Sequence, residues 1–249
     1  MGKTYEHQQS EESSCEYMSR KTIYGPHNFL LLVVLALILV LVIGLIFLGA
    51  VGIAFEDVGF SPIVIALILI ATLIGSYINI PIFKLKATIP MIKDEFVSFF
   101  GVVYRIPEVE YGETATTVAI NMGGAVIPTL VSFYLLWKVP STLSSAIIGV
   151  AIVAVVTHVV ARPVKGVGIT TPVFIPPLVA VLSAFILPSS SPKVIAYVSG
   201  VLGTLIGADL SHLNVIPELG APVASIGGAG TFDGVFLTGI IAVLLAGIR

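Results

Sequence analysis

The sequence predicts an all-α polytopic membrane protein with about seven transmembrane helices, several of them kinked, and a re-entrant glycine-rich loop before the last helix. Two observations carry this prediction. Of the 249 residues, 57% are hydrophobic and only 10% are charged, whereas about 25% of the residues in a soluble domain are charged. The apolar residues also lie in runs of roughly 20, the length at which a helix crosses a bilayer.

The charged residues and the cysteine content exclude several classes of protein. Lys and Arg number 12 against 14 Asp and Glu, so the net charge is −2 and no basic domain is available to bind nucleic acid. Cys15 is the single cysteine, which excludes a disulfide framework and a cysteine-based zinc site. We expect no cofactor, and the lipid bilayer is the expected partner.

The polar residues 1–28 predict a disordered cytoplasmic tail, followed by a single membrane domain over residues 29–249. The first apolar run, Phe29–Ala54, has no charge and ends before Glu56 and Asp57. A secretory signal has a shorter apolar core and a small-residue cleavage site, so we expect this run to be retained as a span.

Six further apolar runs complete the predicted set of spans. The first begins at a proline, which suits a first helical turn because the missing N–H would be unpaired there anyway. The runs Thr171–Leu187 and Asp233–Ile248 are short for a span. The predicted spans are Pro62–Phe83, Val118–Trp137, Leu143–Ala161, Thr171–Leu187, Val194–His212 and Asp233–Ile248.

The longest internal connection, residues 84–117, is predicted to be a cytoplasmic loop. In Ala87–Val103 the apolar side chains recur at roughly helical spacing with charges between them, which is typical of a helix lying in the membrane interface. The following stretch, Arg105–Glu113, is acidic and contains Pro107 and Gly112, so we expect it to lack a helix.

The basic residues predict the orientation of the chain in a cell membrane. With a cytoplasmic N-terminus, nine of the 12 Lys and Arg residues fall in inner segments and three, Lys138, Lys193 and Arg249, in outer ones. This bias agrees with an odd number of spans, so the C-terminus is expected outside.

Ionisable residues within spans are costly and are therefore candidates for function. They are His158, Asp209, His212 and Asp233, with Glu218 in the connection between the last two spans. In the predicted topology all five lie in or near the inner leaflet.

Asp209 stands three residues before His212 and shares a helix face with it. Gly203 and Gly207 are four apart, which lets another helix approach closely. Asp209 is either a carboxylate in a low-dielectric place that exchanges a proton, or an acid at a helix end that meets headgroup water. An Asp at a helix C-terminus is unfavourable with the dipole, which favours the functional interpretation.

Asp233 precedes the last apolar run, where it is either an N-cap or a functional acid, and these roles are compatible. The segment before it, Pro217–Phe232, is too rich in Pro and Gly for a helix and too apolar for a water-exposed loop. Such backbone survives at membrane depth only where protein or a water-filled cavity satisfies it. We therefore expect a re-entrant loop in which Gly227, Gly228 and Gly230 line a pathway.

His158 is expected to be a core histidine that is hydrogen-bonded to a neighbouring helix, and His212 to be interfacial. A metal site built from the histidines and Asp209 and Asp233 matches no metal motif, so none is expected. Asn121–Ala125 and Ser225–Ala229 form an internal echo, each reading polar, apolar, Gly-Gly-Ala. Repeats of this kind occur in transporters, but Gly-Ala pairs also serve helix packing.

Three of these segments carry a family resemblance. They are Gly227-Gly-Ala-Gly-Thr-Phe-Asp-Gly-Val-Phe-Leu-Thr-Gly239, Gly207-Ala-Asp-Leu210 and Asn121-Met-Gly-Gly-Ala-Val-Ile-Pro128. Together they resemble a prokaryotic membrane family, the domain of unknown function number sixteen-fourteen. The likeness covers most of residues 62–249 and implies an integral membrane protein without implying an activity.

A second resemblance concerns Asp233 alone. Intramembrane aspartyl proteases of the presenilin and prepilin-peptidase type place one Asp in a span and a second after Gly-x-Gly in another, and Gly230-Thr-Phe before Asp233 is similar in setting. Phe232 stands where those enzymes have Gly, and no Pro-Ala-Leu follows.

Three functions remain open from the sequence. The first is a small-solute or ion transporter or channel, with Asp209 and Asp233 as acids and with His158, His212, Asn121 and the loop glycines near the pathway. The second is an intramembrane hydrolase in which Asp209 and Asp233 are catalytic. The third is a lipid-binding or scaffold subunit without catalysis. The chain is short for a transporter, which favours a homo-oligomer.

Overall fold

The computed structural model describes residues 26–99, 102–165, 168–228 and 234–248. The chain divides into two units, residues 1–49 and 50–249. Helix α2 (Pro26–Asp57) begins in the first unit and ends in the second. Its side chains from Leu30 to Leu48 are mostly exposed and apolar, as expected of a helix whose natural surroundings are lipid.

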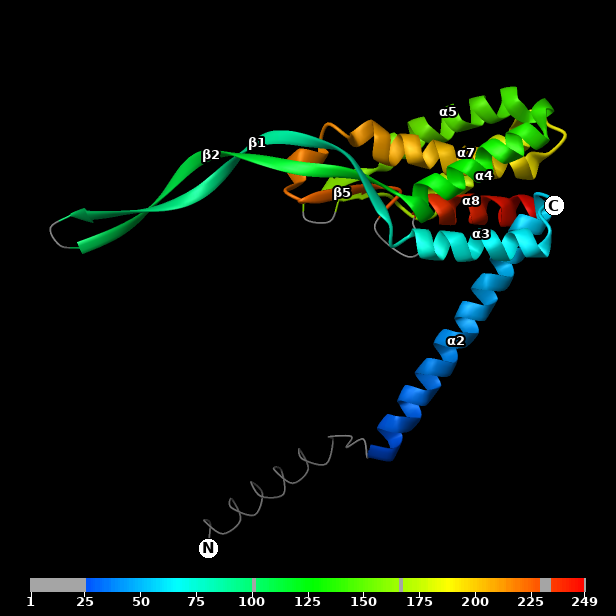
Figure 1. Ribbon diagram of the computed structural model, residues 1–249, viewed down its shortest axis with the longest axis horizontal. Coiled ribbons are helices and arrows are strands. Elements are labelled where there is room, and N and C mark those ends of the chain that lie inside the picture. The colour runs from blue at the N-terminus through cyan, green and yellow to red at the C-terminus, as the bar shows by residue number, and fades with distance from the viewer. Residues whose placement is uncertain (1–25, 100–101, 166–167, 229–233, 249) are drawn as a thin grey trace, which may run out of the picture. The chain divides into compact units, whose positions relative to one another are not determined.

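Six shorter helices form a bundle in the second unit (Figure 1). The central helix is α7, most of whose residues are buried, and it packs against α4, α5, α6 and α8. The bundle helices are α3 (Pro62–Gly75), α4 (Ile127–Lys138), α5 (Leu143–Val160), α6 (Ile175–Ile186), α7 (Pro192–Thr204) and α8 (Gly234–Gly247).

The core of the bundle is built from small and β-branched side chains around α7. Ile195 and Ala196 pack with Val153, Ala180 and Ala242 of the neighbouring helices. The opposite faces of the outer helices expose large apolar side chains, including Leu67, Leu130, Ile147, Val155 and Leu182. A soluble monomer rarely exposes apolar surface this extensively, so the outer faces are suited to lipid.

Three helices in the described residues are long and apolar enough to cross a membrane, namely Leu30–Asp57, Pro140–Val160 and Pro192–His212. They overlap the predicted first, fourth and sixth spans. The other four predicted spans are apolar helices of only 12 to 14 residues. A 14-residue helix rises about 21 Å, whereas the hydrocarbon core measures about 30 Å, so seven complete spans are not confirmed.

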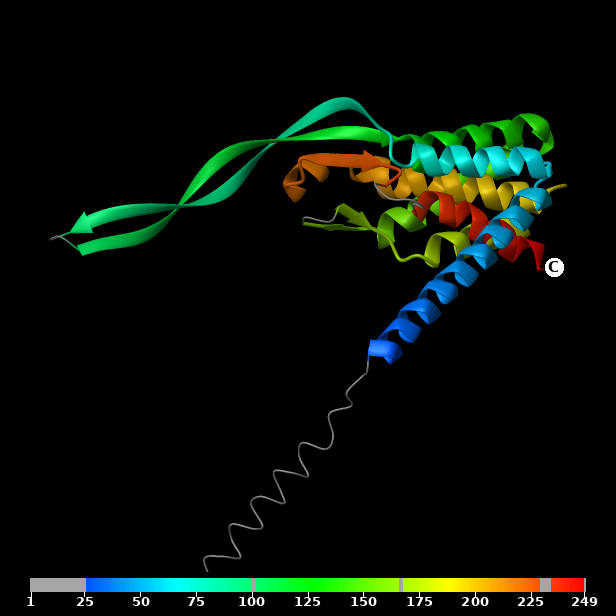
Figure 2. The same ribbon diagram turned by 60° about the horizontal axis from the view of Figure 1, so that its bottom comes forward.

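A long β-hairpin was not predicted. Strands β1 (Asn79–Phe99) and β2 (Val102–Asn121) pair antiparallel from Asn79↔Asn121 to Phe99↔Val102. The distal half of this ribbon lies away from the helices in both views (Figure 1, Figure 2). The prediction of an interfacial helix over Ala87–Val103 is therefore wrong, and so is the purely α-helical fold class.

The physical reason for this error lies in the residue types. β-Branched and aromatic residues make up nine of the 21 residues of β1 and 11 of the 20 residues of β2, and they favour extended backbone. Pro90 and Pro107 each stand inside a strand, where an edge position tolerates a missing N–H. An interior proline would instead break a helix. The strands also take the end of the predicted second span and the start of the third.

A short third strand joins the base of the hairpin. β5 (Val223–Ile226) runs parallel to β2, with Thr117 opposite Val223 and Ile120 opposite Ile226. The sheet order is β1-β2-β5, so β2 is central where the three overlap. Strands β3 (Arg162–Val164) and β4 (Gly168–Thr170) form a separate antiparallel pair.

The segments that connect successive helices lie alternately at the two ends of the bundle. At one end Lys138 donates to the carbonyl of Gly59, and Ser145 donates to the carbonyl of Pro188. At the other end the hydroxyl of Thr116 donates to the carbonyl of Ala221. The chain between Ala50 and Gly228 therefore runs up and down between the two ends of the bundle.

Candidate functional site

The central helix changes its geometry at the end that carries the sheet. α7 is followed by a π turn, η3 (Leu205–Asp209), and then by a 3₁₀ turn, η4 (Leu210–His212). The backbone N–H of Leu210 reaches the carbonyl of Leu205, five residues earlier. Positions five apart on an α-helix point about 140° apart, and a wider π turn reduces this angle. The turn therefore brings Thr204 and Asp209 toward one side of the helix.

Close packing against α5 holds this part of the chain. A Cβ atom added at Gly203 would overlap the side chain of Val153, and one added at Gly207 would overlap the carbonyl of Ala154. Only glycine allows the two backbones to approach this closely. The prediction that Gly203 and Gly207 admit a neighbouring helix is confirmed.

Asp209 is half-buried and binds the loop that leads toward α8. Its Oδ2 accepts a hydrogen bond from the backbone N–H of Gly227 at 2.7 Å. Gly227 and Gly228 have φ angles of +81° and +75°, which residues with a side chain rarely adopt. The positive φ angles turn the chain sharply after β5 and aim the N–H of Gly227 at the carboxylate.

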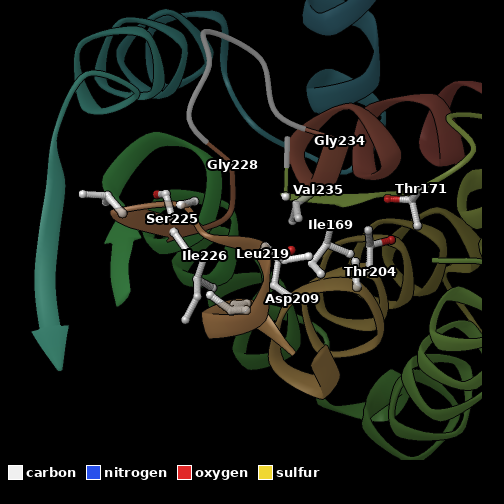
Figure 3. A pocket seen from close by; sticks show the side chains of 16 residues that line it. Ile169, Thr171, Thr204, Asp209, Leu219, Ser225, Ile226, Gly228, Gly234 and Val235 are labelled. Carbon is white, nitrogen blue, oxygen red and sulfur yellow. The ribbon is translucent and has the colours of Figure 1, made fainter. Parts of the chain in front are cut away.

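A cavity of about 190 Å³ opens beside this hydrogen bond. Asp209 supplies the single carboxylate among the described residues of its wall, and Thr171, Thr204 and Ser225 supply hydroxyl groups. Apolar side chains such as Ile226 fill the rest of the wall (Figure 3). The cavity thus combines one acid, several hydroxyls and non-helical backbone.

Thr204 has an unusual position in this wall. Its side chain is 3% exposed, and its hydroxyl has no hydrogen-bond partner among the described residues. Buried hydroxyl groups in proteins are nearly always paired. The hydroxyl oxygen itself is fully buried, so Thr204 borders the cavity with other atoms.

The segment over the cavity is not a regular helix, as the sequence predicts. η5 (Ile216–Leu219) is a 3₁₀ turn, Gly220 has a φ of +72°, and β5 follows. The remainder of the predicted re-entrant loop, with Gly230 and Asp233, lies outside the described residues.

Asn121 joins the two glycine-rich turns of the internal echo. Its buried amide donates to the carbonyl of Ser76 and to Oδ1 of Asn79, while its Oδ1 accepts from the N–H of Gly124. The hydroxyl of Ser225 donates to the same Oδ1 of Asn79 at 2.6 Å. Asn121 and Ser225 are equivalent positions of the echo, so the structure brings the two copies together through Asn79.

The glycine pairs of the echo also touch. A Cβ atom at Gly227 would lie 2.6 Å from both the N and the Cβ of Ala125. Asn121 caps η1 (Met122–Val126), the π turn that leads into α4. Each copy therefore has the same order of elements in the described residues, a strand followed by a glycine pair.

His158 and His212 lie together at the end of the bundle that carries the sheet. Their ring centroids are 4.6 Å apart. Nδ1 of His158 lies 2.7 Å from the hydroxyl of Ser211, and Nδ1 of His212 lies 2.9 Å from the carbonyl of Ala208. The expected bond of His158 to a neighbouring segment is present, but the prediction of a core position is wrong, because His158 is exposed. His212 is buried. Within the described residues no three His, Cys, Asp or Glu side chains form a metal-binding group.

Comparison with known families identifies the chain at the family level. A family model described as "Protein of unknown function (DUF1614)" matches residues 73–245, which is most of the chain. The chain belongs to this family. The DUF1614 region includes the hairpin, the bundle from α4 to α7, most of α8 and every described residue of the cavity wall. No curated protein and no solved structure matches the chain.

Membership of the DUF1614 family confirms the resemblance seen in the glycine-rich segments, and it assigns no activity. Sequence reasoning found Asp209 because an acid within an apolar run is conspicuous. It missed Thr204, because hydroxyl residues are ordinary in membrane helices and only burial without a partner distinguishes this one.

Proposed function

We propose that the protein is a multi-pass membrane transporter or channel for a small solute or ion, with Asp209 as the carboxylate that binds and releases it. The observation that carries the proposal is a cavity wall that combines the carboxylate of Asp209 with the hydroxyl groups of Thr171 and Ser225. A carboxylate attracts a cation or a proton, and a hydroxyl supplies a further oxygen.

The backbone around the cavity supports this role. Transporter sites are often formed where helices are interrupted, because unwound backbone offers carbonyl groups to the substrate. Here α7 loosens into a π turn and a 3₁₀ turn, and the opposite wall is the irregular segment from Ile216 to Gly228. The site therefore combines a fixed acid with backbone that can change shape.

The surface of the protein supports a location in the membrane. Apolar side chains cover the outward faces of the bundle helices, and alternate connections lie at opposite ends. With the basic residues as a guide, the end with the hairpin and Asp209 faces the cytoplasm and the end with Gly59 and Pro188 faces outside. The C-terminus is then outside, and a homo-oligomer is the assembly that we expect for a chain of this length.

Flux through liposomes that contain the purified full chain tests the proposal. We would compare the wild type with Asp209→Asn for Na⁺, K⁺, methylammonium and protons. The Asn side chain keeps an oxygen that accepts from the N–H of Gly227, so the variant removes the charge and retains the loop contact. Glu218→Gln is the matched control, because Glu218 is an exposed acid outside the cavity wall.

We expect wild-type flux of at least one probe, unchanged flux in Glu218→Gln, and a reduction of about tenfold or more in Asp209→Asn, which corresponds to a barrier about 1.4 kcal/mol higher. Flux in Asp209→Asn equal to the wild type would overturn the role of Asp209. The same passage of every probe through vesicles with and without the protein would overturn the proposal as a whole.

A further inference from the structure

Two histidines from separate elements form a pair outside the cavity wall. His158 lies near the end of α5, and His212 ends the 3₁₀ turn η4. Their ring planes are tilted by 33°, with the centroids 4.6 Å apart. Neither histidine is among the described residues of the cavity wall, so the pair is separate from the proposed transport site.

A serine determines which ring nitrogen of His158 carries the proton. The hydroxyl of Ser211 donates to the carbonyl of Gly207 at 2.5 Å, so its own hydrogen is engaged. The oxygen of this hydroxyl lies 2.7 Å from Nδ1 of His158 and therefore accepts a hydrogen bond from it. In the neutral ring the proton is then on Nδ1, and Nε2 carries a lone pair.

The backbone makes the same assignment for His212. Its Nδ1 lies 2.9 Å from the carbonyl oxygen of Ala208, and a carbonyl only accepts hydrogen bonds. The proton of this ring is therefore also on Nδ1. In the part of the chain that the structure describes, Nε2 of neither His158 nor His212 has a hydrogen-bond partner. Two neighbouring rings thus each keep a nitrogen lone pair available.

Histidines that bind metal ions have this arrangement. A metal-ligating histidine almost always donates its other ring N–H to a protein oxygen or a water, which fixes the tautomer and the orientation of the ring. A zinc ion lies about 2.0–2.1 Å from each ligating nitrogen, so two imidazoles on one ion have centroids about 4.5–5.2 Å apart at ligand angles from about 90° to tetrahedral. The separation of 4.6 Å between His158 and His212 falls in this range.

We propose that His158 and His212 bind a divalent transition-metal ion such as Zn²⁺ through their Nε2 atoms. Imidazole suits zinc, copper and nickel, whereas carboxylate and carbonyl oxygens suit magnesium and calcium. No third His, Cys, Asp or Glu joins the pair among the described residues, so water completes the coordination and the ion is exchangeable. The site goes beyond the proposed function and does not depend on it.

A bound ion would join two elements that are already in contact. His158 belongs to α5, and His212 belongs to the turn after η3, where Gly207 packs against the carbonyl of Ala154 of α5. Coordination by both rings adds a second link between these elements. Because the unfolded chain does not hold the two rings together, the ion should stabilise the folded state.

Calorimetric titration of the purified full chain with Zn²⁺ tests the site. The chain has four histidines and one cysteine, so the background carries His7→Gln, His27→Gln and Cys15→Ser, and the purification tag contains no histidine. The site variants are His158→Asn and His212→Asn. The amide nitrogen of Asn takes the position of Nδ1 and keeps its hydrogen bond, while the nitrogen proposed to bind the metal is lost.

We expect one Zn²⁺ per chain in the background protein and an affinity at least tenfold lower in each Asn variant. Zn²⁺ should raise the unfolding temperature of the background protein and leave that of both Asn variants unchanged. The background substitutions themselves should not alter the affinity of the wild type. With EDTA present, all these proteins should unfold at similar temperatures, because the Asn variants keep the hydrogen bonds of Nδ1.

Ser211→Ala tests whether the serine positions His158. This variant keeps both histidines and removes the oxygen that accepts from Nδ1, and losing such a partner lowers metal affinity about 10–100-fold. Ser190→Ala is the matched control, because Ser190 is exposed and its hydroxyl lies 3.0 Å from that of Ser141 at the other end of the bundle. We expect Ser190→Ala to bind Zn²⁺ as the background protein does.

Cu²⁺ in place of Zn²⁺ reports the ligands directly by electron paramagnetic resonance. The spectrum should show coupling to two imidazole nitrogens in the background protein and to one in each Asn variant. Coupling to one nitrogen or none in the background protein would overturn the inference. So would a Zn²⁺ affinity that neither Asn variant lowers, or no uptake of Zn²⁺ at millimolar concentration, and the contact would then be ring stacking alone. None of these measurements depends on transport.

Discussion

The carboxylate of Asp209 accepts a hydrogen bond from the backbone N–H of Gly227 across 18 positions of sequence. This bond links the end of the central helix to the turn after β5. Because Gly227 also packs against Ala125, one residue contacts both the cavity acid and the turn that begins α4.

Gly227→Ala should destabilise the protein more than Gly220→Ala. Both glycines have a positive φ. An alanine in this conformation is less favourable than glycine by about 1–2 kcal/mol. Only at Gly227 would the new Cβ also overlap a neighbour, whereas the space beside Gly220 is open. Thermal unfolding in detergent should show the larger fall for Gly227→Ala. Equal falls would mean that the contact with Ala125 is absent.

Asn121→Ala should lower the unfolding temperature more than Asn79→Ala. Asn121 is fully buried and bonds to Ser76, Asn79 and Gly124, so its loss leaves buried groups unpaired at about 1–3 kcal/mol each. Asn79 is exposed, and water can replace its bonds. The comparison uses the same detergent and heating rate for both variants, and a larger effect of Asn79→Ala would contradict the network.

Gly207→Val should separate α5 from α7 and destabilise the bundle by about 1–3 kcal/mol or more, as overpacking does. The obstacle is the carbonyl of Ala154, which is backbone and cannot move aside as a side chain can. Gly44→Val is the control, because nothing lies within 4 Å of a Cβ at Gly44. Chemical denaturation of the two variants measures the difference, which should vanish if the helices are not in close contact.

Cysteines placed at Lys86 and Ala115 should form a disulfide under mild oxidation. The two residues are directly opposite in the hairpin, and paired strands bring Cα atoms to about 4.5–5.5 Å, within disulfide reach. The background carries Cys15→Ser to remove the native thiol. The pair Lys86 and Val103 should remain reduced, and a cross-link there instead would indicate a different register.

Single cysteines should show which side of the membrane each end of the bundle faces. In a Cys15→Ser background, Ser190→Cys should react with a membrane-impermeant maleimide added to intact cells. Ser98→Cys, in the hairpin, should react only after permeabilisation, because the basic residues of the inner segments predict a cytoplasmic hairpin. Labelling of both from outside would overturn the predicted orientation.

The sequence predicted the apolar helices well and their ends poorly. Hydropathy locates a helix such as Leu143–Val160 because the whole run is buried or faces lipid. It cannot separate a short apolar strand from a helix, which is why Asn79–Phe83 and Val118–Asn121 were assigned to spans. The pairing of β1 with β2 depends on contacts between distant residues, and no local pattern encodes their register.

The candidate site was predicted in part for a similar reason. Asp209, Gly227 and Gly228 were selected by residue type and position, and the structure brings them together. Asn121 was selected as a binding residue, and the structure shows its side chain bonded to Ser76, Asn79 and Gly124. The burial of the Thr204 and Tyr197 hydroxyls without a partner is a property of the packed bundle and is invisible in sequence.

The central position of β2 at the base of the sheet has a mechanical consequence. Residues Thr117–Ile120 pair with β1 on one side and with β5 on the other. β2 continues without a break into the distal half of the hairpin, so one strand links the distal hairpin directly to β5. A tilt of the distal half of the hairpin would move β5 and, with it, the N–H of Gly227. A force applied to the distal hairpin would thereby lengthen or shorten the hydrogen bond from Gly227 to Asp209.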